Sequence, residues 1–457
     1  TLRDIDRGAH NTLKQWAKQL NLTDSAKKCN DRVVLADMVR AWSFAGLSDS
    51  QIVERAEELI QGKIRARASS QESAERAKGI LIRNNIAIIK PNQKTSVKHL
   101  WRRGALVAVR ESKIGILLTN LGTPEAPTRE ALKPYLKQFL WDPRVVEIPR
   151  PIWWLILNGI ILNTRPKRSA EAYAQVWTDR GSPLLANLKE QVNGISQRLE
   201  SKFGDQFVVM GAMRYGQPAI EKTLNEMFDA GIQKLLVLPL YPQYGGPTTG
   251  STFDEVAAKL TQRRWLPSLR FISNYHDHPS YIGAVSDSIR NHWDNNGRAE
   301  TLLFSYHGMP KQYLLEGDPY HCQCYKTSRL IAEALKLKEG EYITTFQSRF
   351  GREEWLQPYT DETLKSLPEQ QINSAQVVCP GFSADCLETI EEIGIENRDY
   401  FIASGGSRYE YIPCLNAQPK HLDAITEILI SELGEWTTSK PNPQASKHLA
   451  LKLGAER

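Results

Sequence analysis

Features that this 457-residue sequence lacks, or has little of, exclude several classes of protein. Six cysteines are too few for a chain of this length to depend on a disulfide framework, which favours a reducing compartment. No apolar run reaches the roughly 18–20 residues that a membrane-spanning helix needs. The N-terminus shows no signal-peptide pattern of basic start, apolar core and small-residue cleavage site. We therefore expect a cytoplasmic protein, with any membrane contact limited to peripheral binding at the inner face of the plasma membrane.

Charge is spread unevenly along the chain, which has a net charge of +6 at neutral pH. Residues 1–110 hold 21 Lys+Arg against 11 Asp+Glu, whereas the remainder holds 37 against 41. Apolar residues in the first 80 positions follow helical spacing, for example at Leu13, Trp16 and Leu20. We expect residues 1–110 to form a basic, mainly helical extension of unknown function. Nucleic-acid binding competes there with the commoner case of a basic surface that is only solvated.

From Lys113 onward, short apolar runs alternate with stretches of helical periodicity. Helices are expected, for example, over 219–230 and 252–263. The expected strands are 114–118, 207–210, 235–238, 271–272, 301–307, 342–346 and 376–379. Strands that alternate with helices are typical of a parallel α/β sheet.

A weak internal repeat divides this region into two similar halves. One half opens with a strand that ends in 120–124, and the other with a strand that ends in 306–310. Later in each half, an apolar strand ends at Pro239 or Pro380, followed by a turn and a helix. We expect two Rossmann-like halves, 111–285 and 286–435, on either side of a cleft. The remaining residues, 436–457, are rich in Ser, Lys and Pro and are expected to be disordered.

His307 stands at the end of the strand expected over 301–307, and Gly308 and Pro310 form the turn that follows. Ligands of open α/β sheets bind beyond the carboxyl ends of the strands. An imidazole there can take up a proton near neutral pH. The alternative is a turn histidine whose hydrogen bond to a backbone carbonyl is purely structural.

A row of carboxylates follows the turn at Pro380. A helix is expected to begin near Ser383, which would place Asp385, Glu388 and Glu392 on one face. Crowded buried carboxylates raise one another's pKa and can carry protons or a hard divalent cation. The alternative is a solvated acidic helix start, which the helix dipole favours.

Residues 151–162 are unusually apolar and contain two tryptophans, with Arg150, Arg165, Lys167 and Arg168 beside them. The stretch is too short to span a membrane but suits the interface of an anionic bilayer. A buried core helix and the apolar lip of a pocket for a flat ligand are the alternatives.

Other candidates follow predicted strands. Arg214 can pair with a ligand carboxylate, and Trp355 can stack on a planar ligand. Tyr241 and Tyr244 precede a turn rich in Gly, Thr and Ser that suits an anion but lacks the P-loop motif. Near His321, Cys322 and Cys324 resemble metal ligands, but no second cysteine pair lies at zinc-finger spacing.

Taken together, these stretches resemble the ferrochelatases. The resemblance covers about residues 113–421, and residues 1–110 lie outside it. It implies insertion of Fe²⁺ into protoporphyrin IX to give protohaem, with release of two protons. It also implies a porphyrin cleft between the halves and no organic cofactor, iron being a substrate. The matching stretches, in the family's order, are 120–124, 180–184, 213–215, 241–244, 249–251, 304–310, 346–351 and 384–388.

The resemblance also assigns roles to residues. His307 matches the active-site histidine and Glu388 its acidic partner, and both are expected to be catalytic and to meet the metal. Asp385 and Glu392 are expected to extend a proton or metal path, and 151–162 to be the lip through which porphyrin enters from the membrane. The residues expected to bind porphyrin are Leu121, Arg165, Ser182, Arg214, Tyr215 and Trp355.

The sequence departs from the family at two positions. Gly246 stands where some members carry a cysteine ligand of an iron–sulfur cluster, so no cluster is predicted. Cys386 stands where many members have a histidine, which weakens a two-histidine metal route. A chelatase for another tetrapyrrole or metal, such as coproporphyrin or cobalt, and a non-catalytic haem or porphyrin carrier are the alternative functions. The sequence does not indicate an oligomeric state.

Overall fold

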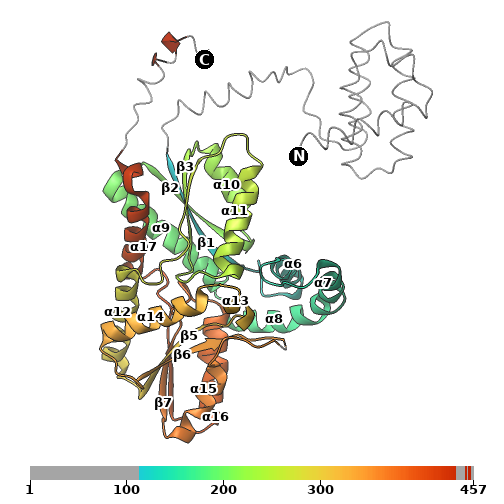
Figure 1. Cartoon of the computed structure of the whole chain (residues 1–457), viewed down its shortest axis with the longest axis vertical. Coiled ribbons are helices and arrows are strands. Elements are labelled where there is room, and N and C mark those ends of the chain that lie inside the picture. The colour runs from blue at the N-terminus through green and yellow to red at the C-terminus, as the bar shows by residue number, and fades with distance from the viewer. Residues whose placement is uncertain (1–112, 352, 439–447, 450, 454–457) are drawn as a thin grey trace, which may run out of the picture. The chain divides into compact units, whose positions relative to one another are not determined.

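The computed structural model describes residues 113–351, 353–438, 448–449 and 451–453 (Figure 1). The expectations for residues 1–110 lie outside the described residues, as does most of the tail after residue 438. No helix among the described residues is long and apolar enough to cross a membrane.

The described chain forms two four-stranded parallel sheets. The first, with strand order β2-β1-β3-β4, consists of β1 (Ile114–Thr123), β2 (Phe207–Gly216), β3 (Lys234–Pro239) and β4 (Ser268–Phe271). The second, with order β6-β5-β7-β8, consists of β5 (Thr301–His307), β6 (Tyr342–Gln347), β7 (Ser374–Val378) and β8 (Arg408–Ile412). Because the two orders are equivalent, the prediction of two similar α/β halves is confirmed.

Helices cover both faces of each sheet, which explains why the central strands are continuous apolar runs. In the first half, α9 (Pro183–Phe203) packs on one face of β1, and α10 (Ile220–Asp229) and α11 (Ser251–Thr261) pack on the other. In the second half, α12 (Pro279–Asn296) and α14 (Tyr320–Leu335) oppose α15 (Thr360–Ser366) and α16 (Arg398–Ala403). Ile116, Leu117 and Leu118 of β1 are fully buried as a result.

The two halves share one hydrophobic core, because the last long helix returns to the first half. Helix α17 (Pro419–Leu433) runs beside α9 and α12 (Figure 1), and its apolar residues belong to the same core cluster. Arg198 of α9 pairs with Asp423 of α17 at 2.6 Å, and Arg270 of β4 donates to the carbonyl of Leu433 at 2.6 Å. The halves are therefore joined by apolar packing and by ion pairs and hydrogen bonds.

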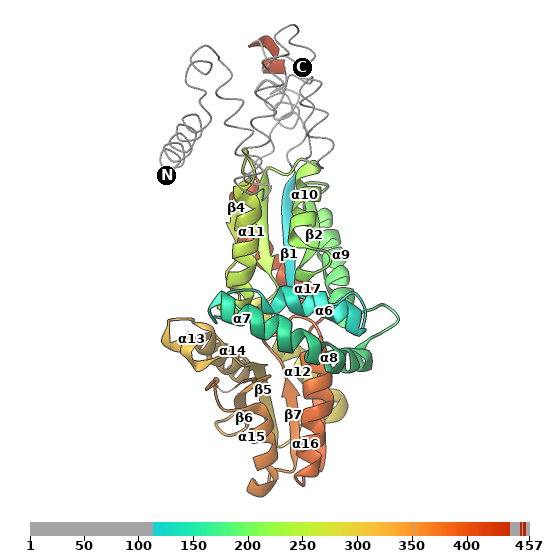
Figure 2. The same ribbon diagram turned by 90° about the vertical axis from the view of Figure 1, so that its right-hand side faces the viewer.

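The helices between β1 and α9 project to one side of the sheets (Figure 1), the side that faces the viewer in Figure 2. They are α6 (Arg129–Leu140), α7 (Arg150–Ile156), the π-helix η2 (Leu157–Ile161) and α8 (Leu162–Val176). The other short helices are α13 (Lys311–Leu315), η3 (Gly246–Gly250), η4 (Pro368–Gln370), η5 (Glu388–Asn397) and η6 (Gly434–Thr437).

One local expectation was wrong, and one strand was not predicted. The helix expected from Ser383 begins only at Leu387 and continues as the π-helix η5, because residues 381–386 form turns and irregular backbone. Strand β8 was missed because it is short and carries Arg408 and Glu410, which occupy the exposed edge of the sheet.

Candidate active site

A cavity of about 1060 Å³ lies where the carboxyl ends of the two sheets meet. Its wall includes 120–123 at the end of β1 and 307–313 at the end of β5 and after it. It also includes 240–241, Gln243 and 247–248 after β3, and 381–384 and 386–388 after β7. These are the topological switch points of the two sheets, where open α/β folds bind ligands. The volume is slightly above the range of about 300–1,000 Å³ that is common for small-molecule pockets, so a large ligand fits.

The projecting helices supply another wall of the cavity. Trp153 and Ile161 line it, while the opposite side of the same segment exposes more than half of Ile152, Trp154 and Leu155. The alternative of a fully buried core helix for 151–162 is therefore wrong, because one side of the segment is exposed and residues of the other side line the cavity. We call residues 142–176, which include this segment, the lip.

His307 ends β5 and lines the cavity. Its Nδ1 lies 2.7 Å from the carbonyl oxygen of Gly308. A carbonyl only accepts, so Nδ1 carries the hydrogen, and Nε2 of the neutral ring is the acceptor. The backbone thus fixes the tautomer that can take up a proton through Nε2.

Glu388 lines the same cavity and is the first residue of η5. Glu392 follows on the π-helix and accepts hydrogen bonds from Ser348, one from its backbone N–H at 2.7 Å and one from its hydroxyl. Burial is the main reason that the pKa of Glu392 is raised to about 7; the negative charge of Glu388 adds to this, and the Ser348 hydrogen bonds oppose it. Glu392 therefore exchanges a proton near neutral pH.

Asp385 lies apart from this pair, which corrects the expectation of three carboxylates on one helix face. It precedes the helix, and its carboxylate accepts hydrogen bonds from Tyr411 Oη at 2.6 Å and Asn416 Nδ2 at 2.6 Å. It also accepts the backbone N–H of Cys414 at 3.2 Å. These contacts tie the turn after β7 to the end of β8 and to the residues that follow it.

Gln347 connects the histidine strand to the π-helix, and sequence reasoning did not single it out. Its carbonyl accepts the N–H of Gly308 at 2.7 Å, and its Nε2 donates to the carbonyl of Glu388 at 2.8 Å. Ser305 donates to its Oε1 at 2.7 Å. The signal available in the sequence was a polar residue at the end of a buried strand next to the His307 strand.

Four of the six residues expected to bind porphyrin, Leu121, Arg165, Ser182 and Trp355, line the cavity. The Arg165 guanidinium lies over the Phe350 ring at 5.4 Å, which links the lip to the second half. Trp355 is buried, and its Nε1–H has no hydrogen-bond partner within the protein.

The other two, Arg214 and Tyr215, are not among the residues that line the cavity. Tyr215 is fully buried, and both side chains donate hydrogen bonds to the Asp142 carboxylate, at 2.6 Å from Arg214 and 2.8 Å from Tyr215. The structure therefore places them behind the cavity wall.

Further polar groups of the cavity residues lack partners within the protein. They are Thr123 Oγ1, Tyr241 Oη and Ser383 Oγ, each buried without a hydrogen bond. Buried polar groups are usually satisfied, so such atoms beside a cavity are candidates for ligand contacts.

The five described cysteines are free. His321 stacks on Phe346, with ring centroids 5.7 Å apart, and Cys324 is buried while Cys322 is exposed. Within the described residues, no group of three or more His, Cys, Asp and Glu side chains is arranged to hold a metal ion.

Comparison with known proteins identifies the family. The ferrochelatase family model matches residues 113–433. A ferrochelatase of Pseudoalteromonas atlantica is 61% identical over 345 residues, covering 76% of this chain and 96% of that protein. One of Idiomarina loihiensis is 61% identical over 332 residues, covering 73% of this chain and 91% of that protein. The solved structure of SirB from Bacillus subtilis with Fe³⁺ covers 72% of this chain and 98% of its own, at 12% identity and a TM-score of 0.42. The chain belongs to the ferrochelatase family, and its activity is that of a ferrochelatase.

Proposed function

We propose that the cavity holds protoporphyrin IX and that His307 is the base for metal insertion. The observation that carries this is the hydrogen bond from Nδ1 to the Gly308 carbonyl, which leaves Nε2 as the accepting nitrogen in a cavity large enough for a macrocycle. Insertion of Fe²⁺ into the ring displaces two pyrrole N–H protons. An imidazole with a free lone pair is suited to take them in turn.

Glu388 and Glu392 receive the protons and carry them away from the ring. Glu388 is in the cavity wall, and Glu392 lies four residues further along a helix with i→i+5 hydrogen bonds, so the two follow each other along one side. A group with a pKa of about 7 both accepts and releases a proton at neutral pH, as a relay requires. A carboxylate in the cavity wall can also ligate an incoming Fe²⁺ ion. Glu388 is therefore also proposed to contact the metal.

Cavity residues then bind the porphyrin. Leu121 and Trp355 offer apolar and aromatic surface to the macrocycle. Arg165, which is exposed on the lip, is placed to pair with a propionate. Ser182 is buried in the wall and has a hydroxyl to offer.

The lip carries porphyrin between the cavity and a membrane surface. Its exposed side presents Ile152, Trp154 and Leu155, and the basic Lys167 and Arg168 are exposed further along α8. Apolar and aromatic groups with nearby cations favour the interface of an anionic bilayer. This supports a peripheral location on the inner face of the cytoplasmic membrane.

No organic cofactor and no iron–sulfur cluster are part of the proposal. Gly246, the position of a cluster cysteine in some ferrochelatases, donates its backbone N–H to the Asp318 carboxylate at 2.7 Å. This contact joins the turn after β3 to the second half. A Cβ at this position would lie 3.3 Å from the same carboxylate, so the site is close-packed.

Glu388→Gln tests the proposal, with Glu391→Gln on the same π-helix as control. We expect Glu388→Gln to lower kcat for haem formation by about 100-fold, within the range for loss of a general acid–base group, while porphyrin binding stays within twofold. The control keeps wild-type kcat. Unchanged kcat in Glu388→Gln would contradict its role. Binding of porphyrin without turnover in the wild type would instead favour a carrier.

A further inference from the structure

The cavity wall between α6 and α7 has no secondary structure of its own. Residues 142–149 form turns between the two helices, and four of them, Val145, Val146, Glu147 and Ile148, line the cavity. The path of the backbone through residues 142–149 is therefore set by side-chain contacts, because these residues belong to no helix or strand.

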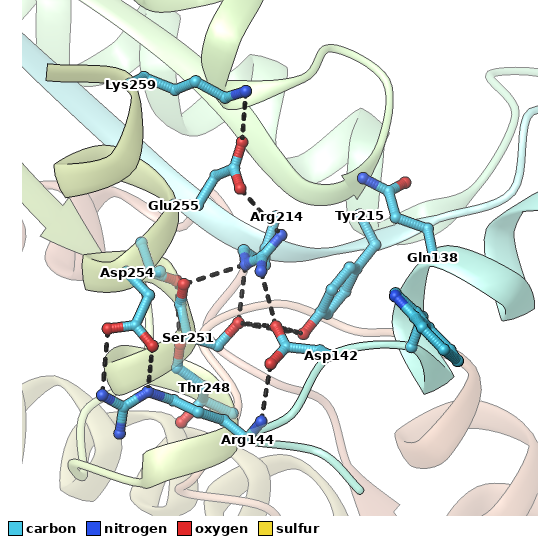
Figure 3. Close-up of polar contacts among 12 residues, drawn as sticks. Gln138, Asp142, Arg144, Arg214, Tyr215, Thr248, Ser251, Asp254, Glu255 and Lys259 are labelled. Carbon is cyan, nitrogen blue, oxygen red and sulfur yellow. Dashed lines mark hydrogen bonds and ion pairs between the residues drawn. The ribbon is translucent and has the colours of Figure 1, made fainter. Parts of the chain in front are cut away.

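Asp142 makes those contacts. Its Oδ2 accepts hydrogen bonds from Arg214 at 2.6 Å, Tyr215 at 2.8 Å and Ser251 at 2.6 Å (Figure 3). Its Oδ1 accepts the backbone N–H of Arg144 at 2.8 Å. The carboxylate thus has four donors and is shielded from solvent, its side chain being 3% exposed.

Three of the four donors belong to regular elements of the first half. Arg214 and Tyr215 lie near the carboxyl end of β2, and Ser251 is the first residue of α11. Tyr215 and Ser251 are fully buried, and Arg214 is held further by Glu255 at 3.7 Å. Asp142 is consequently held by β2 and α11 as well as by its own neighbour Arg144.

The backbone of Asp142 is hydrogen-bonded to the residues of the cavity wall. Its carbonyl accepts the N–H of Val145 at 3.1 Å and of Val146 at 3.0 Å. Arg150, at the start of α7, in turn donates to the carbonyls of Trp141 and Val146. A chain of hydrogen bonds therefore runs from β2 through Asp142 to the cavity wall and the first turn of the lip helix.

We propose that Asp142 is a positioning residue that sets the wall of the porphyrin cavity, and that Arg214 and Tyr215 act on porphyrin through Asp142 without touching it. This rests on the proposal that porphyrin occupies the cavity. The charges around the site agree with this role. The positive charge of Arg214 and the hydrogen bonds from the other donors offset the cost of burying the Asp142 carboxylate.

The exposed contact beside it provides a matched control. Arg144 pairs with Asp254 of α11, with Nη2 to Oδ1 at 3.0 Å, but the side chains are 40% and 47% exposed. Exposed pairs of this kind contribute little. Asp254→Asn therefore removes a lip contact of similar chemistry that the proposal does not need.

The test compares Asp142→Asn with Asp254→Asn in the full chain. We expect Asp142→Asn to raise the porphyrin KM and the Kd from fluorescence titration about tenfold, to change KM for Fe²⁺ less than twofold and to speed hydrogen exchange at Val145 and Val146. Asp254→Asn leaves all four within twofold. Should Asp142→Asn fail to fold, Ser251→Ala removes one donor and is expected to raise the porphyrin Kd about threefold.

Two results would overturn the proposal. One is wild-type porphyrin affinity in Asp142→Asn, or in Ser251→Ala where only that variant folds. The other is a change in KM for Fe²⁺ with no change for porphyrin. A third variant, Trp355→Ala, distinguishes a wrong role for Asp142 from a wrong assignment of the porphyrin cavity. If porphyrin binds elsewhere, Trp355→Ala also keeps wild-type affinity, whereas it weakens binding if the cavity is right and only the role of Asp142 is wrong.

Discussion

Replacing Glu392 with glutamine is expected to change how the stability of the protein depends on pH. The pKa of Glu392 is raised from 4.5 to about 7, mainly by burial. The folded state therefore holds this proton more tightly than the unfolded state does. Stability from this group is fully present below pH 4.5, falls as the pH rises from 4.5 to about 7, and is constant above that.

The size of the effect follows from the displaced pKa. Moving it from 4.5 to about 7 corresponds to about 3 kcal/mol of unfolding free energy. The side chain retains some exposure to solvent, so this is an upper bound. Glutamine keeps the shape and an oxygen to accept the Ser348 N–H, but it cannot ionise.

Urea unfolding at pH 5 and pH 8 measures the change. Relative to the wild type, Glu392→Gln should gain up to about 2.5 kcal/mol of unfolding free energy between pH 5 and pH 8, because part of the change already occurs below pH 5. Glu354→Gln is the control, because Glu354 is in an exposed ion pair with Lys311 at 2.9 Å and should change stability by less than about 1 kcal/mol at both pH values. Parallel pH curves for the wild type and Glu392→Gln would mean that Glu392 is ionised in the folded protein throughout, and the relay would lose its basis.

Two further predictions concern the lip and the end of β1. Trp154→Ser should weaken binding to anionic vesicles about fivefold, because about 1 kcal/mol of apolar transfer free energy is lost. Trp265→Ser is the control and should leave binding unchanged, since Trp265 is 52% exposed and Trp154 54%. Equal losses of binding for the two variants in a vesicle-sedimentation assay would refute a specific membrane face. Gly122→Ala should lower the free energy of unfolding by about 3 kcal/mol or more, because φ is +133° and a Cβ would lie 2.0 Å from the Tyr215 carbonyl oxygen. Gly283→Ala, in α12 with nothing within 4 Å, should instead add about 0.5–1 kcal/mol, and similar urea midpoints for the two variants would contradict this reasoning.

The fold was predictable from the sequence where burial on both sides produces continuous apolar runs. The strands at 114–118 and 301–307 have that pattern, and they became the central strands β1 and β5. Edge strand β8 was missed because its alternating Arg408, Tyr409 and Glu410 reflect partial exposure. Short edge strands owe their conformation to pairing with a neighbour, which local sequence does not specify.

The candidate site was only partly predictable, for a related reason. His307 and Glu388 were identifiable because each follows a recognisable strand, and the topology brings those ends to one cavity. The π-helix was not, because an acidic stretch with helical periodicity does not distinguish i→i+5 from i→i+4 hydrogen bonds. Arg214 was assigned to the ligand because a cation after a strand suggests an anion; that the anion is the Asp142 carboxylate depends on a contact 72 residues away in the chain.

Anaerobic haem formation from Fe²⁺ and protoporphyrin IX, in the wild type and in His307→Ala, tests the central claim most directly. His278→Asn is the control, since asparagine also caps the start of α12, where His278 accepts the N–H of Ser280. The proposed role of His307 predicts turnover in the wild type and the control, and a loss of at least about 100-fold in His307→Ala with porphyrin binding retained. Equal turnover in all three proteins would contradict it and would mean that the active site lies elsewhere.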